Sequence, residues 1–136
     1  MDVFVYGTLT DRDRAAAVLG DDGFEFVGTA RLRGLHRVEG RYPTLAPGGC
    51  VEGRLLHTDR IEALDHYESV ADGLYVRVSV PGDGEAIAVY VGDPDRLGVS
   101  ESIEWSGDGP FDERVERYVL GGGVQVERVG GSSSSP

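Results

Sequence analysis

A short glycine-containing segment near the start of the sequence is suited to binding an anion. Tyr6, Gly7, Thr8 and Leu9 follow a run of β-branched and aromatic residues. A glycine at the end of a strand lets the backbone turn sharply and present its N–H groups outward, which suits a carboxylate. The segment has neither the Gly-Lys-Ser/Thr of a P-loop nor the three spaced glycines of a dinucleotide fold, so a phosphate ligand is not expected. A glycine here also fits an ordinary turn.

Glu68 is the candidate for proton transfer. On a helix, Ile61, Leu64 and Glu68 fall at i, i+3 and i+7, so the carboxylate shares a face with apolar side chains. Burial disfavours the charged form and raises the pKa of a carboxyl group, which makes it a usable proton acceptor and donor near neutral pH. In the alternative interpretation the helix ends near Tyr67 and Glu68 is solvated. The pattern alone leaves both open.

Three further polar residues compete for a place in such a site. Asp65 lies four residues after Ile61, so it is a second candidate for the inward position. Its other expected roles are a contact with Arg77 or with the end of the helix. Tyr75 and Arg77 lie two residues apart on one face of a predicted strand, and an arginine there can hold a carboxylate through paired hydrogen bonds. A structural salt bridge or a solvated side chain is the alternative for Arg77.

Metal and thiol chemistry find little support in the sequence. Glu62 and His66 are spaced i, i+4, with His57 and Asp59 nearby, but no further ligand follows at a suitable spacing. We therefore expect no metal site and no cofactor. Cys50 is the single cysteine, so an intrachain disulfide is excluded, and its expected role is unreactive packing.

The charge of the chain limits its partners. The 136 residues include 24 Asp and Glu against 13 basic residues, all of them Arg, for a net charge of -11. Nucleic acids and anionic membranes need a positive surface, so neither is an expected partner. The absence of lysine excludes Schiff-base chemistry. An acidic, lysine-free composition resembles that of proteins from salt-loving archaea. No signal peptide or membrane-length apolar run is visible, and we expect a cytoplasmic protein.

The elements that must position these groups follow from periodicity and turn residues. We expect strands at 3–6, 24–38 (bent at Gly28 and Gly34), 51–57, 74–80 and 85–91, and helices at 10–19, 61–68 and about 111–119. Thr10 and Asp59 are the expected helix caps, and the turn at 81–84 makes the last two strands a hairpin. Because strands and helices do not alternate regularly, an α+β class is favoured. One domain is expected at 1–120, followed by a Gly- and Ser-rich tail at 121–136 whose end is disordered.

Six motifs follow one another along the chain: Val-Phe-Val-Tyr-Gly-Thr-Leu at 3–9, Gly-Arg-Tyr-Pro-Thr-Leu at 40–45, Val-Glu-Gly-Arg-Leu-Leu at 51–56, Leu-Asp-His-Tyr-Glu at 64–68, Tyr-Val-Arg at 75–77 and Ala-Val-Tyr at 88–90. This ordered series resembles the γ-glutamylcyclotransferase-like family, which includes γ-glutamylamine cyclotransferases and plant avirulence-induced proteins. The resemblance implies a small mixed β-barrel with flanking helices. It also implies that the first loop binds the substrate and that Glu68 is the catalytic acid–base.

The same resemblance implies an activity. The expected enzyme converts a γ-glutamyl amine, amino acid or peptide to 5-oxoproline and a free amine, without metal or cofactor. Its expected substrate-binding residues are Tyr6, Gly7, Thr8, Leu9, Tyr75 and Arg77. The alternatives are an enzyme that removes a γ-glutamyl group from a biosynthetic intermediate and a non-enzymatic domain that binds a small molecule. Two departures from the family concern the substrate: Ser69 stands where a glycine is frequent, and Thr10-Asp11-Arg12 replaces basic and Asn residues. The sequence gives no oligomeric state.

Overall fold

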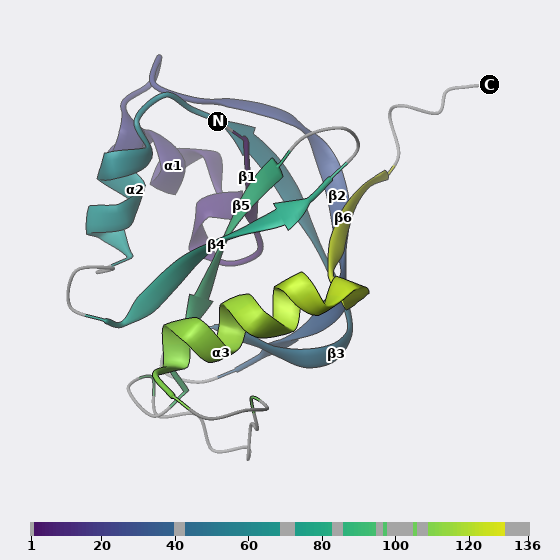
Figure 1. The fold of residues 1–136 in the computed structure, drawn as a ribbon. Helices are drawn as coiled ribbons and strands as arrows, with labels where there is room; N and C mark the ends of the chain where they lie inside the picture. The colour runs from purple at the N-terminus through teal and green to yellow at the C-terminus, as the bar shows by residue number, and fades with distance from the viewer. Residues whose placement is uncertain are drawn as a thin grey trace.

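A six-stranded mixed sheet, curled into a half-barrel, forms the centre of the molecule, and helices lie on both of its sides (Figure 1). The computed structural model describes residues 2–39, 43–68, 73–82, 86–94, 97, 105 and 109–129. The expected α+β class, with a mixed curled sheet and flanking helices, is confirmed. The motif residues at 40–42, Ser69, the tip of the turn at 83–84 and the end of the tail at 130–136 lie outside the described residues.

The strand order places the first strand in the middle of the sheet. The strands are β1 (Asp2–Val5), β2 (Glu25–Val38), β3 (Thr44–His57), β4 (Tyr75–Pro81), β5 (Ala86–Gly92) and β6 (Gln125–Val129). They lie in the order β4-β5-β1-β3-β2-β6, in which β1 pairs in parallel with β5 and every other pair is antiparallel. A central strand is covered on both faces, which explains the continuous apolar run of β1.

The first helix begins two residues later than the sequence predicts, and the other two begin where expected. They are α1 (Arg12–Leu19), α2 (Ile61–Tyr67) and α3 (Phe111–Tyr118), with a 3-10 turn η1 (Thr8–Thr10) and a π-helical turn η3 (Val119–Gly123). Asp11, and not Thr10, caps α1 by accepting a hydrogen bond from the N–H of Asp13. Asp59 does not cap α2. Arg60 occupies the N-cap position, and its side chain makes no capping hydrogen bond. None of the described helices has the length and apolar character of a membrane span.

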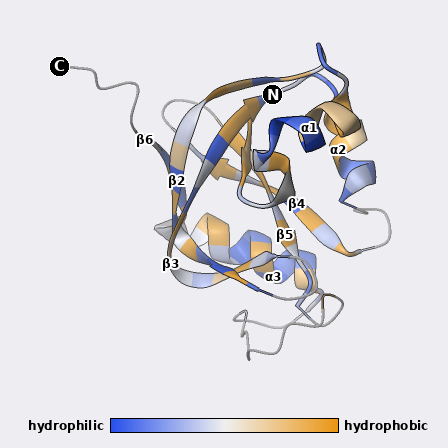
Figure 2. Cartoon of the chain, turned by 180° about the vertical axis from the view of Figure 1, so that it is seen from behind, coloured by the Kyte–Doolittle hydropathy of each residue, from blue (hydrophilic) through white to orange (hydrophobic). Residues whose placement is uncertain are grey.

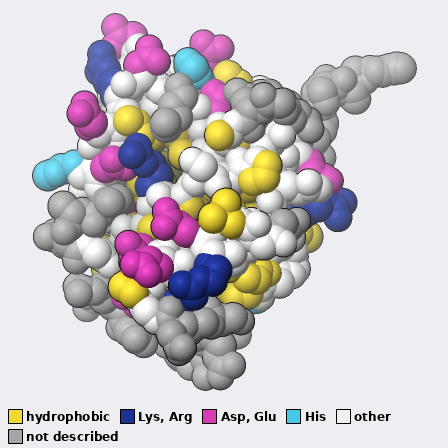
Figure 3. All heavy atoms as spheres, viewed as in Figure 1, with side chains coloured by type: hydrophobic (Ala, Val, Ile, Leu, Met, Phe, Trp, Pro, Cys, Tyr) yellow, Lys and Arg dark blue, Asp and Glu magenta, His cyan; other side chains and the backbone are white. Residues whose placement is uncertain are grey.

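Two clusters of buried side chains cover opposite faces of the sheet. One lies within the curl, where Phe4 and Val89 pack with Val115 of α3. The other lies between the sheet and the pair α1 and α2, and contains Val3 and Leu64. Figure 2 shows the apolar residues gathered on the strands, whereas α1 is mostly hydrophilic. Figure 3 shows acidic side chains scattered over the visible face, mainly toward the top and left of the view; the net charge of the chain is -11.

Two bulges bend the long β2–β3 ladder. The register shifts between Phe26 and Gly28 and again between Arg33 and Leu35. Gly34 has a φ of 94°, a backbone conformation that favours glycine, and its position leaves no space for a side chain beside the backbone of Gly123. Bulges increase local bending and twist, so these two allow the sheet to curl.

Two strand segments were not expected. β3 begins at Thr44, seven residues before the predicted start, and β6 lies in the segment interpreted as a tail. Pro47, Gly48 and Gly49 have weak strand preference, but pairing with β2 continues past them to Val38↔Thr44. β6 pairs with β2 from Thr29↔Val129 to Arg33↔Gln125, so the sheet continues beyond residue 120.

Candidate active site

A cavity of about 370 Å³ lies where the end of β1 meets the end of α2 and the start of β4. Its walls come from separate parts of the chain. Its lining includes Tyr6, Gly7 and Leu9 after β1, Arg14 on α1, Glu68 at the end of α2, and Tyr75 and Tyr90 on β4 and β5. The volume is at the lower end of the range of small-molecule sites, roughly 300–1,000 Å³. The structure thus brings Glu68 and the first loop to one hollow.

Glu68 is the acid in this cavity, and its environment changes its chemistry. α2 ends at Tyr67, as the alternative interpretation has it, but Glu68 is partly buried and not solvated. Its N–H donates to the carbonyl of Leu64 at 2.9 Å, which continues the helical direction by one residue. Burial raises the pKa of Glu68 from 4.5 to about 7. The side chain therefore exchanges protons near neutral pH, as general acid–base catalysis requires.

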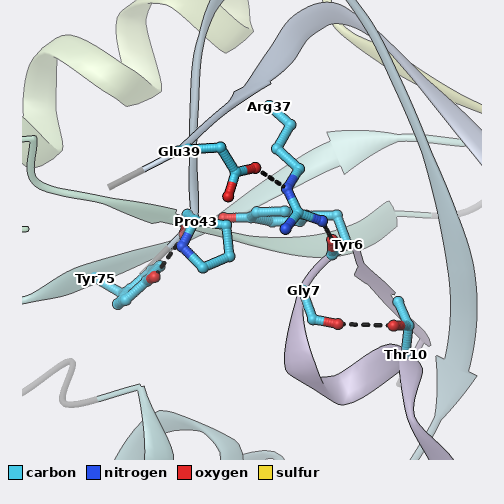
Figure 4. A network of polar contacts seen from close by, with 7 residues as sticks. All are labelled: Tyr6, Gly7, Thr10, Arg37, Glu39, Pro43 and Tyr75. Carbon is cyan, nitrogen blue, oxygen red and sulfur yellow. Dashed lines mark hydrogen bonds and ion pairs between the residues drawn. The ribbon is translucent and has the colours of Figure 1, made fainter. Parts of the chain in front are cut away.

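The loop after β1 is held by hydrogen bonds to its carbonyl groups (Figure 4). The Thr10 hydroxyl and N–H both donate to the carbonyl of Gly7, at 2.7 and 3.1 Å. Arg37 donates from Nη1 to the carbonyl of Tyr6 at 2.7 Å, and Arg54 donates to that of Thr10 at 2.9 Å. Among the described residues, none accepts a hydrogen bond from the N–H of Gly7. The carbonyls are thus engaged, and N–H groups stay available to an anionic ligand.

Gly7 packs closely against Pro43. A Cβ atom at this position would lie 3.1 Å from Cγ of Pro43, tighter than an ordinary van der Waals contact. Pro43 also accepts a hydrogen bond through its carbonyl, from the hydroxyl of Tyr75 at 2.7 Å (Figure 4). The loop, Pro43 and Tyr75 therefore form one packed wall of the cavity.

Buried tyrosines form the rest of the wall, and their hydroxyl groups donate to the protein. The Tyr6 hydroxyl donates to the carbonyl of Tyr90 at 2.6 Å, and the Tyr90 hydroxyl donates to Oδ1 of Asp65 at 2.6 Å. Burial raises the pKa of both tyrosines far above the usual value of 10.0. Both stay neutral at physiological pH, so neither is a proton acceptor for a substrate.

The predicted site residues differ in where they lie. Tyr6, Gly7, Leu9, Tyr75 and Glu68 line the cavity. Thr8 belongs to the same loop as the first residue of η1, and its side chain is outside the described part of the structure.

Arg77 is not a lining residue of this cavity. Its Nη1 lies 3.4 Å from Oδ2 of Asp65, which is the contact expected from the sequence. Arg77 faces a second hollow with Asp93, Asp112 and Glu116, on the side of β4 toward α3. The strand alternation groups Tyr75 with Arg77, but only Tyr75 reaches both hollows because it lies at the start of the strand. A role for Arg77 in holding the substrate in the cavity is therefore not supported by its position.

The sequence does not single out several of the residues that build the site. Arg14 and Tyr90 line the cavity, and Arg37 and Arg54 hold the loop. Each comes from a helix or strand segment, and the sheet register together with the packing of α1 on the sheet brings them together. In the described part of the chain, no group of three or more His, Cys, Asp or Glu side chains could hold a metal ion. Cys50 is exposed.

Solved structures share the fold. A γ-glutamyl cyclotransferase matches with a TM-score of 0.57 and 17% sequence identity, over 89% of this chain and 98% of its own. A Pyrococcus horikoshii protein matches with a TM-score of 0.54 and 20% identity, over 87% and 96%. At these identities the likeness defines a class of protein, those with the γ-glutamyl cyclotransferase fold.

Sequence comparison goes one step further than the fold. An Arabidopsis thaliana protein solved in solution is 32% identical over 82% of this chain and 78% of its own, with a TM-score of 0.53. The family model for gamma-glutamyl cyclotransferase, AIG2-like, matches residues 3–107. The chain belongs to this family. A search of curated proteins gives no match.

Proposed function

We propose that the protein converts a γ-glutamyl compound to 5-oxoproline and a free amine, with Glu68 as the general acid–base. The observation that carries this proposal is the position of Glu68, whose pKa is about 7, in one cavity with the loop of Gly7 and Leu9. Family membership supports the reaction class. A purely binding domain has no use for a carboxyl group placed to exchange protons.

Binding would fold the substrate for ring closure. The N–H groups of Gly7, Thr8 and Leu9 hold the α-carboxylate of the γ-glutamyl group, since backbone donors favour an anion. The tyrosine walls of Tyr6 and Tyr75 exclude water and restrict the side chain of the substrate. The α-nitrogen then lies against the γ-carbonyl carbon of the same molecule. Because the attack is intramolecular, positioning supplies much of the rate.

The proton transfers balance without added water. Glu68, as a carboxylate, takes a proton from the α-ammonium group, and the freed amine attacks the γ-carbonyl carbon. A C–N bond forms in the ring, and the C–N bond to the second amine breaks as protonated Glu68 delivers a proton to it. Overall, two protons pass from the α-nitrogen to the departing nitrogen. The products are the lactam, 5-oxoproline, and the ammonium form of the amine, so Glu68 returns to its starting state.

The test measures 5-oxoproline from a panel of γ-glutamyl amines, amino acids and peptides in buffered salt. Wild-type protein is expected to release it from at least one compound. Glu68→Gln keeps the shape but carries no exchangeable carboxyl proton, and should lower kcat by about 100-fold or more. Glu62→Gln is the matched control, because Glu62 is an exposed acid on the same helix. No 5-oxoproline from any compound, or an unchanged rate in Glu68→Gln, contradicts the proposal.

A further inference from the structure

Arg14 gives the cavity a positive end. Among the described residues that line the cavity, Arg14 is the one cation and Glu68 the one acid. Arg14 is exposed, whereas Glu68 is partly buried, so the cation lies nearer to solvent than the acid. A ligand that fills this cavity meets a proton carrier at depth and a guanidinium group toward the mouth.

Arg14 has no partner in the described part of the protein. No hydrogen bond or ion pair joins it to another described residue, although Arg31, Arg33 and Arg37 each form an ion pair. Asp13 directly precedes Arg14 in α1, but neighbouring residues on a helix do not face each other. Asp11, three residues earlier, uses its carboxylate to cap α1 through the N–H of Asp13. The guanidinium group of Arg14 therefore has its hydrogen-bonding capacity available to a ligand.

The position of Arg14 brings no benefit to helix stability. It is the third residue of α1, in the first turn, where the helix dipole disfavours a cation. No ion pair joins Arg14 to Glu68 among the described residues, and burial is the cause of the raised pKa of Glu68. Arg14 therefore neither stabilises α1 through the helix dipole nor forms an ion pair with Glu68.

We infer that Arg14 binds a carboxylate on the amine half of the substrate, so the substrates are γ-glutamyl amino acids or short peptides and not simple γ-glutamyl amines. This inference rests on the proposed function, in which the loop N–H groups hold the α-carboxylate and leave Arg14 for a second anion. The amine half departs as product, so it lies toward the mouth, where Arg14 is. A γ-glutamyl dipeptide of about fifteen non-hydrogen atoms suits a cavity at the lower end of the usual range.

The experiment compares γ-glutamylalanine with its C-terminal amide at fixed ionic strength. Removing the carboxylate should lower kcat/KM of the wild type by about tenfold, the order expected for a charge-assisted contact. Arg14→Gln should lose this preference, and Arg14→Lys should retain part of it. Arg12→Gln is the matched control, because Arg12 is exposed on the same turn, stacks on Phe24 and does not line the cavity. It should keep the preference of the wild type.

The outcomes separate this inference from the function on which it rests. Equal kcat/KM for the dipeptide and its amide in wild type overturns the inference, while release of 5-oxoproline upholds the function. A second analogue carries an amide in place of the α-carboxylate of the γ-glutamyl half. If the wild type discriminates against this analogue and Arg14→Gln does not, Arg14 holds the α-carboxylate of the γ-glutamyl half, and the inference is wrong. If no 5-oxoproline forms, the function fails, and calorimetric binding of the dipeptide and its amide decides the inference. Tighter binding of the dipeptide that depends on Arg14 supports it, and equal or absent binding overturns it.

Discussion

Glu68→Gln should change how the stability of the protein depends on pH. The pKa of Glu68 is about 7 in the folded protein against 4.5 for an unburied glutamate. Below pH 4.5 the group is protonated in both the folded and unfolded states, so it adds no penalty. Above pH 7 the folded state must hold a buried charge. At about 1.4 kcal/mol for each pH unit between these values, the wild type loses about 3 kcal/mol of unfolding free energy from this group as pH rises.

Gln cannot ionise, so the variant escapes this loss. Between about pH 4.5 and pH 8 the unfolding free energy of the wild type should fall by about 3 kcal/mol relative to Glu68→Gln. For a domain of this size the difference corresponds to roughly 10 °C in Tm. Urea unfolding at constant salt measures it, with the fluorescence of Trp105 as a probe, because Trp105 is the single tryptophan and is buried.

The comparison between variants isolates Glu68 from the other carboxylates. Glu62→Gln removes an exposed acid from the same helix, and its pH dependence should follow the wild type. If the unfolding free energies of wild type and Glu68→Gln run parallel across this pH range, Glu68 is not held in an environment that disfavours its charge. The reasoning for its role as a proton carrier would then be refuted.

Three further predictions concern the frame of the site. Gly34→Ala should lower the unfolding free energy by about 3 kcal/mol or more, because an alanine is strained at φ 94° and its methyl group would overlap the backbone of Gly123. A loss below about 1 kcal/mol in urea unfolding contradicts the bulge. Leu64→Ala should cost about 2–5 kcal/mol, since Leu64 is fully buried between α2 and the sheet, and an unchanged Tm would contradict this packing. Tm should rise as KCl increases from about 0.1 to 2 M, because salt screens the repulsion of a net charge of -11, and a flat or falling Tm contradicts that account.

The sequence predicts the elements with strong local patterns. The alternation in Val76, Val78 and Val80 predicts β4, and its hairpin partner β5 pairs with it as expected. By contrast, the start of β3 contains Pro47, Gly48 and Gly49, and β6 follows a glycine-rich segment at 121–123, so the local signal for a strand is weak in both places. They form because β2 offers both of its edges for hydrogen bonding, which is a tertiary effect that no local pattern reports.

The site was predictable only in part, for the same physical reason. Glu68 and Gly7 lie in segments with a clear helical or turn pattern. Arg14 and Tyr90 reach the cavity through the parallel pairing of β1 with β5 and the packing of α1, which sequence spacing does not encode. The alternation also groups Arg77 with Tyr75, but the cavity reaches only the start of β4, so the two side chains have different surroundings.

The pH dependence of 5-oxoproline release tests the central claim most directly, because it reports the ionisation of the group that carries the proton. With a γ-glutamyl substrate, kcat/KM should rise about tenfold per pH unit below about pH 7 and level off above it, as Glu68 loses its proton. Glu68→Gln should remove both the rate and this inflection. An inflection near pH 4.5, or the same profile in wild type and Glu68→Gln, would contradict the claim that Glu68 is the acid–base of a cyclotransferase site.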